Sequence, residues 1–285
     1  MEGQAETPIV SIITVLLNGE ATLERTIRSV LDQRQPGIEY IVIDGGSTDG
    51  SLDIIRRYAD RIAFWQSEAD DGISAAFNRG LEVASGRYVA LVNADDWLSP
   101  DQIARAVARL ERDAAAGRDA AFVFGDLIYH DGSGDARHVI LGDADYARTL
   151  RRNMPDVNHP TMVVRREVYQ EVGGFDPAFR VAMDYDWLQR VHRAGFRGVH
   201  DAAIRGHMSL AGRSDRRFVA GLSEVRQIAI AYGQPASAAW ALFFYRILKG
   251  AAQRLVRETL PAGLHRRLRG LINRGYRPWS PDLAE

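Results

Sequence analysis

Short apolar runs alternate with helical patterns through the first half of this 285-residue chain, and this alternation restricts the fold most strongly. The apolar runs are Ile9–Leu17, Tyr40–Ile43, Ile62–Trp65 and Tyr88–Val92. Helical spacing of apolar residues occurs at Ala21–Leu31, Ser51–Tyr58, Ser74–Ala84 and Pro100–Ala116. Strands that are apolar on both faces are typical of a parallel sheet covered by helices on both sides. The sequence therefore predicts an α/β fold, in which ligands bind beyond the carboxyl ends of the strands.

The second half of the chain is less regular. Its predicted strands are Ala120–Tyr129 and Thr161–Val164, and its predicted helices are Arg166–Val172 and Tyr185–Ala194. From about Asp215 onward the pattern is mostly helical, and the end of the chain is rich in arginine. We expect one catalytic unit over residues 1–214 and a helical, basic carboxyl-terminal extension over residues 215–285.

Composition excludes several kinds of chemistry. The chain has no cysteine, which excludes disulfides, thiolate metal ligands and a cysteine nucleophile. The formal net charge is −1 and no nucleic-acid-binding motif is present, so we expect no nucleic-acid partner. Met1–Thr7 lacks the basic and apolar segments of a secretory signal, and no apolar run reaches the roughly 18 residues that span a bilayer. We therefore expect a cytoplasmic protein.

Acidic or amide side chains follow each of the four apolar runs. They lie in the segments Leu17–Glu20, Asp44–Gly50, Glu68–Gly72 and Asn93–Asp96. Each segment alone is compatible with a turn or a helix cap, because Asp is common in both. Together they predict several negative charges at one edge of the sheet, and a bound divalent cation would relieve their repulsion.

Asn93-Ala94-Asp95-Asp96 is the strongest local signal, because it directly follows an apolar strand. Mg²⁺ and Mn²⁺ prefer oxygen ligands, and proteins commonly hold Mg²⁺ through one or two carboxylates together with substrate phosphates. We predict Asp95 as the metal ligand and Asp96 as a supporting residue. Such a cation would neutralise the charge that develops on a departing diphosphate.

These motifs, in this order, resemble glycosyltransferase family 2, whose members are inverting enzymes of the GT-A fold. The resemblance covers roughly residues Pro8–Gly212 and rests on Val10–Asn18, Ile43–Gly50, Asp70–Ile73 with Asn78–Gly80, and Asn93–Asp95 in the place of the DxD motif. It implies a Rossmann-like, mixed but mostly parallel sheet with flanking helices, as in nucleotide-diphospho-sugar transferases. It also implies a nucleotide-sugar-binding half over residues 8–116 and an acceptor-binding half over residues 117–214.

The resemblance implies which residues contact the nucleotide of the donor. They are Leu17, Asn18, Glu20, Asp44, Ser47, Asp70, Gly72, Asn78, Asn93 and Ala94. Asp44 matches the family residue that hydrogen-bonds the base, and Asp95 matches the acid that holds Mn²⁺ or Mg²⁺. The chain departs from the family at Leu17, where an aromatic residue is common, and at Asn93, which replaces the first acid of the DxD motif.

A second group of motifs resembles the acceptor side of the family. Gly173–Asp176 is followed by Met183–Leu188, and the resemblance implies that Asp184 is the general base. A carboxylate near an apolar pocket has the raised pKa that this task requires. A helix cap is the alternative role for Asp184. Asp186 is the rival base, and we place it with Trp187 among the acceptor-binding residues.

Two histidines complete the predicted site. His159 lies at the start of an apparent strand on the acceptor side, and His207 is a candidate third metal ligand. Arg213 is a candidate phosphate contact. A lone histidine more often has a structural role, which is the alternative for both.

The carboxyl-terminal sequence combines aromatic and basic residues. It contains Trp240, Phe243, Phe244 and Tyr245 near Arg246 and Lys249, and arginines recur over Leu260–Ile272. One interpretation is a basic amphipathic surface that contacts the inner face of an anionic membrane, where lipid-linked acceptors reside. The other is a helical unit that packs on the catalytic core and exposes its arginines to water.

Taken together, the sequence predicts a metal-dependent glycosyltransferase. We expect it to transfer a sugar from a nucleotide diphosphate-sugar to a hydroxyl of a glycan or lipid-linked acceptor, in the biosynthesis of a cell-surface polysaccharide such as lipopolysaccharide. UDP- or dTDP-sugars are the favoured donors, and GDP-sugars are compatible. The alternatives are a catalytically impaired nucleotide-sugar-binding protein and a sugar-phosphate nucleotidyltransferase. The latter class usually has a Gly-rich basic loop after its first strand, where this chain has Asn18-Gly19-Glu20-Ala21.

Overall fold

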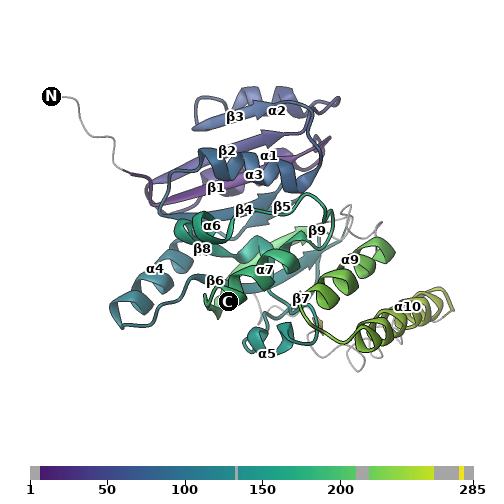
Figure 1. Ribbon diagram of the computed structural model, residues 1–285. Helices are drawn as coiled ribbons and strands as arrows, with labels where there is room; N and C mark the ends of the chain where they lie inside the picture. The colour runs from purple at the N-terminus through teal and green to yellow at the C-terminus, as the bar shows by residue number, and fades with distance from the viewer. Residues whose placement is uncertain (1–6, 132–133, 210–217, 260–275, 279–285) are drawn as a thin grey trace.

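A mixed sheet with helices on both faces forms the body of the protein (Figure 1). The computed structural model describes residues 7–131, 134–209, 218–259 and 276–278. Within them the sheet has ten strands, and its main path runs β10-β7-β6-β8-β4-β1-β2-β3. Strand β9 pairs with both β5 and β6, off this path. Arg213, the predicted phosphate contact, lies outside the described residues.

The first half of the chain forms the parallel part of the sheet. Its strands are β1 (Val10–Leu16), β2 (Ile38–Asp44), β3 (Phe64–Ser67) and β4 (Tyr88–Asn93), all paired in parallel. In this register Leu16 lies beside Asp44 and Asp44 beside Ser67, while Val15 lies beside Asn93. The carboxyl ends of the four strands therefore meet at one edge, as the sequence predicts.

Four helices cover this parallel part: α1 (Leu23–Leu31), α2 (Ser51–Arg57), α3 (Ile73–Val83) and α4 (Gln102–Ala115). Successive strand residues point to opposite faces, so the two sides of β1 enter different apolar clusters. Ile12 packs in a cluster with Ile27 of α1, whereas Ile13 packs in a cluster with Phe77 of α3. These strands are buried on both faces, which explains why they are apolar throughout.

The second half adds mostly antiparallel pairs. Its elements are β5 (Asp96–Leu98), β6 (Phe122–His130), β7 (Ala136–Ile140), α5 (Tyr146–Leu150), the 3₁₀ helix η1 (His159–Thr161), β8 (Val163–Arg165), α6 (Arg166–Val172), α7 (Met183–Arg193) and β9 (Gly198–Ser209). Helix α7 begins two residues before its predicted start. Strand β9 is missing from the sequence prediction, because it is only half-buried and carries polar residues such as His200, Asp201 and Arg205.

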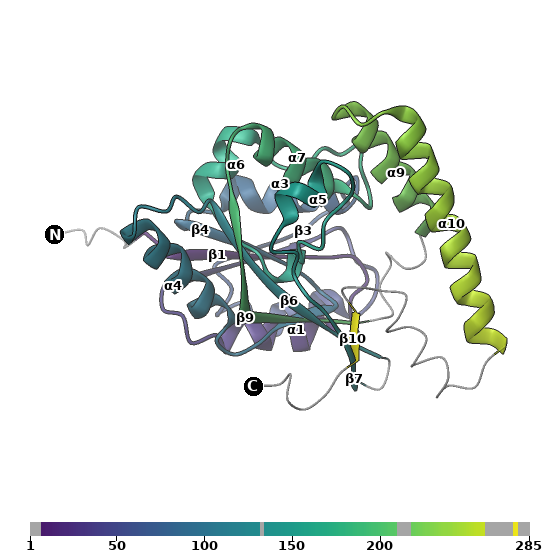
Figure 2. The same cartoon turned by 90° about the horizontal axis from the view of Figure 1, so that it is seen from below.

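The carboxyl-terminal extension packs against this body. It contains α9 (Phe218–Ala231), α10 (Ala236–Thr259) and the short β10 (Tyr276–Pro278), which pairs with β7. Val225 and Ile228 of α9 belong to the same apolar cluster as α3 and α7, while α10 lies along α9 on the outer flank (Figure 2). No helix in the described ranges is both long and apolar enough to cross a bilayer.

Candidate active site

The loops after β1 and β2 are joined by hydrogen bonds between predicted nucleotide-binding residues. The Asn18 amide nitrogen donates to Ser47 Oγ at 2.7 Å, and the Thr48 amide donates to Asn18 Oδ1 at 2.8 Å. The Gly50 amide donates to Glu20 Oε2 at 3.1 Å. The Glu20 carboxylate is therefore held by the neighbouring loop, a role that the sequence prediction of a nucleotide contact missed.

Asp44 ends β2 with its carboxylate buried and hydrogen-bonded at both oxygens. Ser67 Oγ at the end of β3 donates to Asp44 Oδ2 at 2.6 Å, and the Ser47 amide nitrogen lies 3.1 Å from the same oxygen. Ser47 Oγ donates to Asp44 Oδ1. Exposed Leu17 follows the neighbouring strand β1, so an apolar side chain and a fixed carboxylate lie at adjacent strand ends.

Asp70 and Gly72 lie beside this pair of strand ends. A methyl group built on Gly45 would approach Asp70 Oδ2 to 2.7 Å, which places the Asp70 carboxylate over the residue after Asp44. Asp70 Oδ1 accepts from the Gly72 amide at 2.8 Å. Gly72 has φ = 112°, a backbone conformation that residues with a Cβ rarely adopt. The turn that places Asp70 at the carboxyl edge of the sheet therefore requires glycine at position 72.

The turn after β4 is held from helix α1 and strand β9. Thr26 Oγ1 lies 2.9 Å from the Ala94 carbonyl oxygen and 2.6 Å from that of Asp96. Ser209 Oγ donates to the Asp95 carbonyl at 3.1 Å, and Arg25 donates to Ser209 Oγ at 3.0 Å. These bonds fix the backbone on both sides of Asp95, so the predicted metal ligand sits on a rigid turn at the carboxyl edge.

Next to Asp95 lie two buried oxygen atoms that accept no hydrogen bond from the residues that the structure describes. They are Oδ1 of Asn93 and Oδ1 of Asp96, while Asn93 Nδ2 donates to the other Asp96 oxygen at 3.0 Å. Burial, and next the charge of Asp95, raise the pKa of Asp96 well above its ordinary value. The described residues contain no group of three or more His, Asp or Glu side chains placed to hold a metal. This turn therefore fits a cation that takes one or two protein oxygens and its remaining ligands from phosphate.

His207 has hydrogen-bond partners at both ring nitrogens, and its role as a metal ligand stays a prediction. Its Nδ1 lies 2.9 Å from His130 Nε2, and its Nε2 lies 3.0 Å from Ser99 Oγ. His130 Nδ1 faces the Gly134 carbonyl at 2.9 Å and must donate, because a carbonyl only accepts. His130 Nε2 then accepts from His207 Nδ1, and His207 Nε2 accepts from Ser99. Both nitrogens of His207 are used, and the ring stacks on Trp97 at 5.1 Å.

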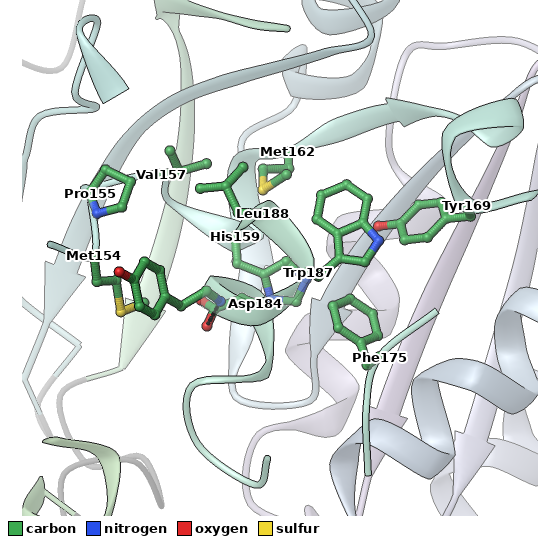
Figure 3. A pocket seen from close by; sticks show the side chains of 11 residues that line it. Met154, Pro155, Val157, His159, Met162, Tyr169, Phe175, Asp184, Trp187 and Leu188 are labelled. Atoms are coloured by element: carbon green, nitrogen blue, oxygen red, sulfur yellow. Dashed lines mark hydrogen bonds between the residues drawn. The ribbon is translucent and has the colours of Figure 1, made fainter. Parts of the chain in front are cut away.

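Asp184 lines a mostly apolar cavity on the acceptor side of the molecule (Figure 3). The cavity is also lined by Met154, Pro155, Val157, His159, Met162, Tyr169, Phe175, Tyr185, Trp187 and Leu188. Burial raises the pKa of Asp184 to about 6. Asp184 lies in the first turn of α7, after the capping residue Ala182, so it is not the helix cap. A carboxylate with this pKa is ionised at neutral pH and still basic enough to accept a proton.

His159 and Trp187 share the cavity with Asp184, so three of the predicted acceptor-side residues lie together. Trp187 stacks on Tyr169 with ring centroids 4.8 Å apart. His159 lies in η1 rather than in a strand, and its ring meets Phe77 edge-on at 5.5 Å. Burial lowers the pKa of His159 to about 4, so the imidazole is neutral at pH 7. Its buried Nε2 has no hydrogen-bond partner.

Asp186 is not among the residues that line this cavity, and its contact with the acceptor stays a prediction. Its Oδ2 is paired with Arg190 Nε at 2.9 Å, and its Oδ1 accepts from the Tyr232 hydroxyl at 3.0 Å. Two residues along an α-helix turn the side chain by roughly 200°, so Asp184 and Asp186 cannot share one face. The ion pair gives Asp186 a structural role, so the geometry favours Asp184 over Asp186 as the base.

Asn78 makes structural hydrogen bonds to Phe175, and its contact with the nucleotide stays a prediction. Its side-chain amide donates to the Phe175 carbonyl at 2.8 Å, and its Oδ1 accepts from the Phe175 amide at 2.7 Å. Nearby, Ser74 Oγ lies 2.9 Å from the Phe179 carbonyl and 3.0 Å from Met183 Sδ. Helix α3, which follows the Asp70 turn, is thereby attached to the segment that carries Asp184. These contacts connect the carboxyl edge of the parallel strands to the segment that leads into the Asp184 cavity.

Glu224 of α9 holds the backbone that leads into α7. Its Oε2 accepts from the amides of Val181 and Ala182, both at 2.8 Å, and its Oε1 accepts from the Arg180 amide at 3.1 Å. The first amides of a helix have no partner within the helix, so this carboxylate acts as a cap supplied from another helix. Its negative charge also contributes to the raised pKa of Asp184, after burial.

We predict that Glu224→Ala lowers the free energy of unfolding by about 1–3 kcal/mol, because it leaves backbone donors near α7 without an acceptor. Urea denaturation measures this loss. Gln227→Ala, an exposed position on the same helix, is the matched control and should change the free energy by less than about 0.5 kcal/mol. Equal losses in the two variants would show that Glu224 does not cap α7.

Sequence reasoning missed Ser67, Arg25, Ser209 and Glu224. Ser67 carries a usable signal, because it ends a parallel strand next to the strand that Asp44 ends. Arg25 and Glu224 lie on helices far along the chain from their partners and carry no local signal. Ser209 reaches Asp95 only because β9 pairs with β5, and both strands escaped prediction.

Comparisons with known proteins identify the family of this chain. Residues 11–173 match the family described as glycosyl transferase family 2. An uncharacterized glycosyltransferase of Mycobacterium tuberculosis is 32% identical over 186 residues, which are 64% of this chain and 68% of the relative. A PGL/p-HBAD biosynthesis glycosyltransferase of Mycobacterium bovis is 30% identical over 186 residues, 63% of this chain and 68% of the relative.

Among solved structures, the fold is similar to that of a mannosyltransferase from Pyrobaculum calidifontis in complex with GDP-Man and Mn²⁺. The TM-score is 0.62 at 20% identity, over 93% of this chain and 79% of the other. This likeness establishes the GT-A fold for the mixed sheet described above. The match of the family to more than half of the chain, together with the relatives and the fold, places this protein in glycosyltransferase family 2.

Proposed function

We propose that this glycosyltransferase moves a sugar from a nucleotide diphosphate-sugar to a hydroxyl of a glycan or lipid-linked acceptor, with inversion at the anomeric carbon. The observation that carries the proposal is Asp184, a carboxylate whose pKa is raised to about 6 in an apolar cavity. Through α3, that cavity is attached to the acidic strand ends. Sugar transfer requires a base for the acceptor hydroxyl and a site that stabilises the leaving diphosphate. Asp184 would supply the first, and the residues at the carboxyl ends of β1 to β4 would supply the second.

The donor is proposed to bind at the carboxyl edge of β1 to β4. Asp44 would accept a hydrogen bond from the base, Leu17 would offer apolar contact, and the Asp95 turn would face the diphosphate. UDP- and dTDP-sugars are favoured by the family resemblance at Asp44. The Pyrobaculum calidifontis neighbour was solved with GDP-Man, so GDP-sugars belong in any test of the donor.

Mn²⁺ or Mg²⁺ is proposed at the Asp95 turn. Asp95 would hold the ion, with Asn93 Oδ1 and Asp96 Oδ1 as buried oxygens beside it that accept no hydrogen bond. When bound, such an ion neutralises charge on the leaving diphosphate. The mannosyltransferase neighbour contains Mn²⁺, which supports this choice of ion.

The proposed chemical step belongs to the residues of the cavity. As the acceptor oxygen bonds to the anomeric carbon, its proton passes to the Asp184 carboxylate, and the bond to the diphosphate oxygen breaks with its electron pair. The hydroxyl approaches from the face opposite the diphosphate, which inverts the centre. Neutral His159 cannot donate a proton at pH 7 and would orient the acceptor, while Trp187 and Tyr169 shape the wall.

The biological setting follows from the relatives and remains part of the proposal. The Mycobacterium bovis relative is named for PGL/p-HBAD biosynthesis, which supports an acceptor of the cell surface. A lipid-linked acceptor is held at a membrane, so we include in the proposal a peripheral contact of the enzyme with the inner membrane face.

A thermal-shift panel of nucleotide-sugars, each with and without Mn²⁺, tests the donor site. We expect the cognate donor to raise the melting temperature only with the ion, because a ligand that binds the native state adds about 2.7 kcal/mol at one hundred times its Kd. Release of nucleoside diphosphate with a mixture of glycan acceptors then tests turnover. Binding without release from any acceptor would indicate an impaired binding protein, and no shift with any donor would contradict the donor site.

A further inference from the structure

The first part of helix α10, Ala236–Leu248, exposes apolar side chains to water. From Ala236 to Leu248 the sequence contains a single charged residue, Arg246. The exposed side chains of this stretch include Trp240, Phe244, Tyr245 and Leu248. Their exposed fractions are 42%, 55%, 59% and 70%, so half or more of each of the last three lies in water. A surface helix normally shows the reverse arrangement, with charged and polar residues toward solvent.

Arg246 points toward the body of the protein. Its Nη2 donates to Asn153 Oδ1 at 2.7 Å, and it lines a small cavity with Leu222 and Phe243. A second arginine, Arg226 of α9, contacts the Trp240 side chain, with its guanidinium carbon 3.8 Å from the ring centroid. Arg246 thus faces inward together with Ala239, Leu242 and Phe243, so packing against the body does not explain the exposed apolar residues of the same helix.

The outer aromatic residues form an ordered strip. Trp240, Phe244 and Leu248 are spaced four residues apart, which places them on one side of the helix. The Trp240 and Phe244 rings stack with centroids 5.5 Å apart. Figure 2 shows α10 on the outer flank of the molecule, with α9 between it and the sheet. The strip is therefore exposed to water over most of its length, while Trp240 at its start also contacts Arg226 of α9.

The sequence that follows the strip is strongly basic. Between Lys249 and Arg277 there is one acid, Glu258, against Lys249, Arg254, Arg257, Arg266, Arg267, Arg269, Arg274 and Arg277. Aromatic and aliphatic residues next to a run of positive charge are complementary to an anionic bilayer, since the rings enter the interface and the charges attract the headgroups. A second copy of this chain would bring the same positive charges together, which disfavours that occupant.

We propose that the strip of Trp240, Phe244, Tyr245 and Leu248 is the surface on which the enzyme rests on an anionic lipid membrane. The inference deepens the proposed function by naming the surface that would bring the enzyme to a lipid-linked acceptor. The biological reason for membrane binding rests on the proposed function. The binding itself does not, because it requires neither donor nor turnover.

Co-sedimentation of the full chain with phosphatidylcholine vesicles, with and without phosphatidylglycerol, tests the proposal in the absence of any sugar donor. We expect binding to the vesicles that contain phosphatidylglycerol, and a decrease as salt is raised, because salt screens the attraction between headgroups and basic residues. Phe244→Ser/Leu248→Ser should lower the vesicle partition constant about tenfold or more, since each large apolar side chain contributes substantially to burial in the interface.

Phe64→Ser is the matched control, because Phe64 is an exposed aromatic residue on β3, at the other end of the sheet. It should bind vesicles as the wild type does. Thermal unfolding and donor binding of both variants show whether the fold and the active site survive. Equal vesicle binding by wild type and the double variant would overturn the proposal. Failure of the wild type to bind anionic vesicles would also overturn it. A wild-type dimer that the double variant disrupts would assign the strip to self-association instead. A failure of donor binding in the wild type would contradict the proposed function alone.

Discussion

Asp184→Asn should reduce the rate of sugar transfer by about 10²–10⁴-fold, the range that a positioned general base contributes. The amide has nearly the same shape as the carboxylate but cannot take the proton of the acceptor hydroxyl. Nucleotide binding should be unchanged, because Asp184 lies in the acceptor-side cavity, away from the carboxyl edge of β1 to β4. Transfer is measured as release of nucleoside diphosphate, and binding by calorimetry with Mn²⁺.

The pH profile of the wild type provides a second measurement of the same residue. The base acts when ionised, and its pKa is raised to about 6. Activity should therefore be full above that pH, fall as the pH drops through about 6, and reach about a tenth of the plateau one unit below. The acid limb should disappear from the residual activity of Asp184→Asn.

Asp186→Asn separates the two candidate bases. Asp186 is paired with Arg190 and Tyr232, so its loss should reduce stability, while the acid limb of the activity stays near pH 6. A loss of transfer in Asp186→Asn with unchanged stability, together with an active Asp184→Asn, would assign the base to Asp186 instead.

Asp95→Ala should weaken the metal-dependent binding of the nucleoside diphosphate by about 30-fold or more. Removing one partner of a desolvated charge pair typically costs about 2 kcal/mol or more, which corresponds to this factor. The binding that remains should not respond to Mn²⁺. Addition of a chelator to the wild type should reproduce the affinity of the variant, and calorimetry with and without the ion measures all of these quantities.

Asp53→Ala is the control for this measurement, because Asp53 is an exposed acid on α2 that pairs only at the surface with Arg56. It should keep the affinity and the response to Mn²⁺. If Asp95→Ala still binds the nucleotide more tightly with Mn²⁺ than without, the ion is held elsewhere and the proposed role of the turn is wrong.

The parallel half of the fold was predictable because its strands are buried on both faces and are therefore apolar at nearly every position. Once β1 to β4 are parallel, their carboxyl ends must share an edge, so Asp44 and the Asp95 turn are brought to one side by topology alone. The same reasoning reaches Ser67, which we did not deduce. Strands β5 and β9 were not predictable, because they are short or only half-buried and have no clear alternation.

The side-chain partners in the site were less predictable than their positions. A motif places Asp184 and Asp186 side by side in the sequence, but the start of α7 at Met183 decides which of them faces the cavity. Asn78 hydrogen-bonds Phe175, His207 hydrogen-bonds His130 and Ser99, and one carboxylate oxygen of Glu20 accepts from Gly50. Those partners depend on how distant segments fold together, and local spacing contains no information about them.

The bonds from Glu224 to the amides before α7 have a consequence for any shortened version of this enzyme. A chain cut after residue 214 would retain every residue proposed to contact donor or acceptor. It would lack Glu224, whose carboxylate holds the amides just before α7, the helix that carries Asp184. Val225 and Ile228 would be missing from the core at the same time. We expect such a fragment to keep most of its nucleotide affinity and to lose most of its transfer activity, because the lost contacts support the helix that carries Asp184.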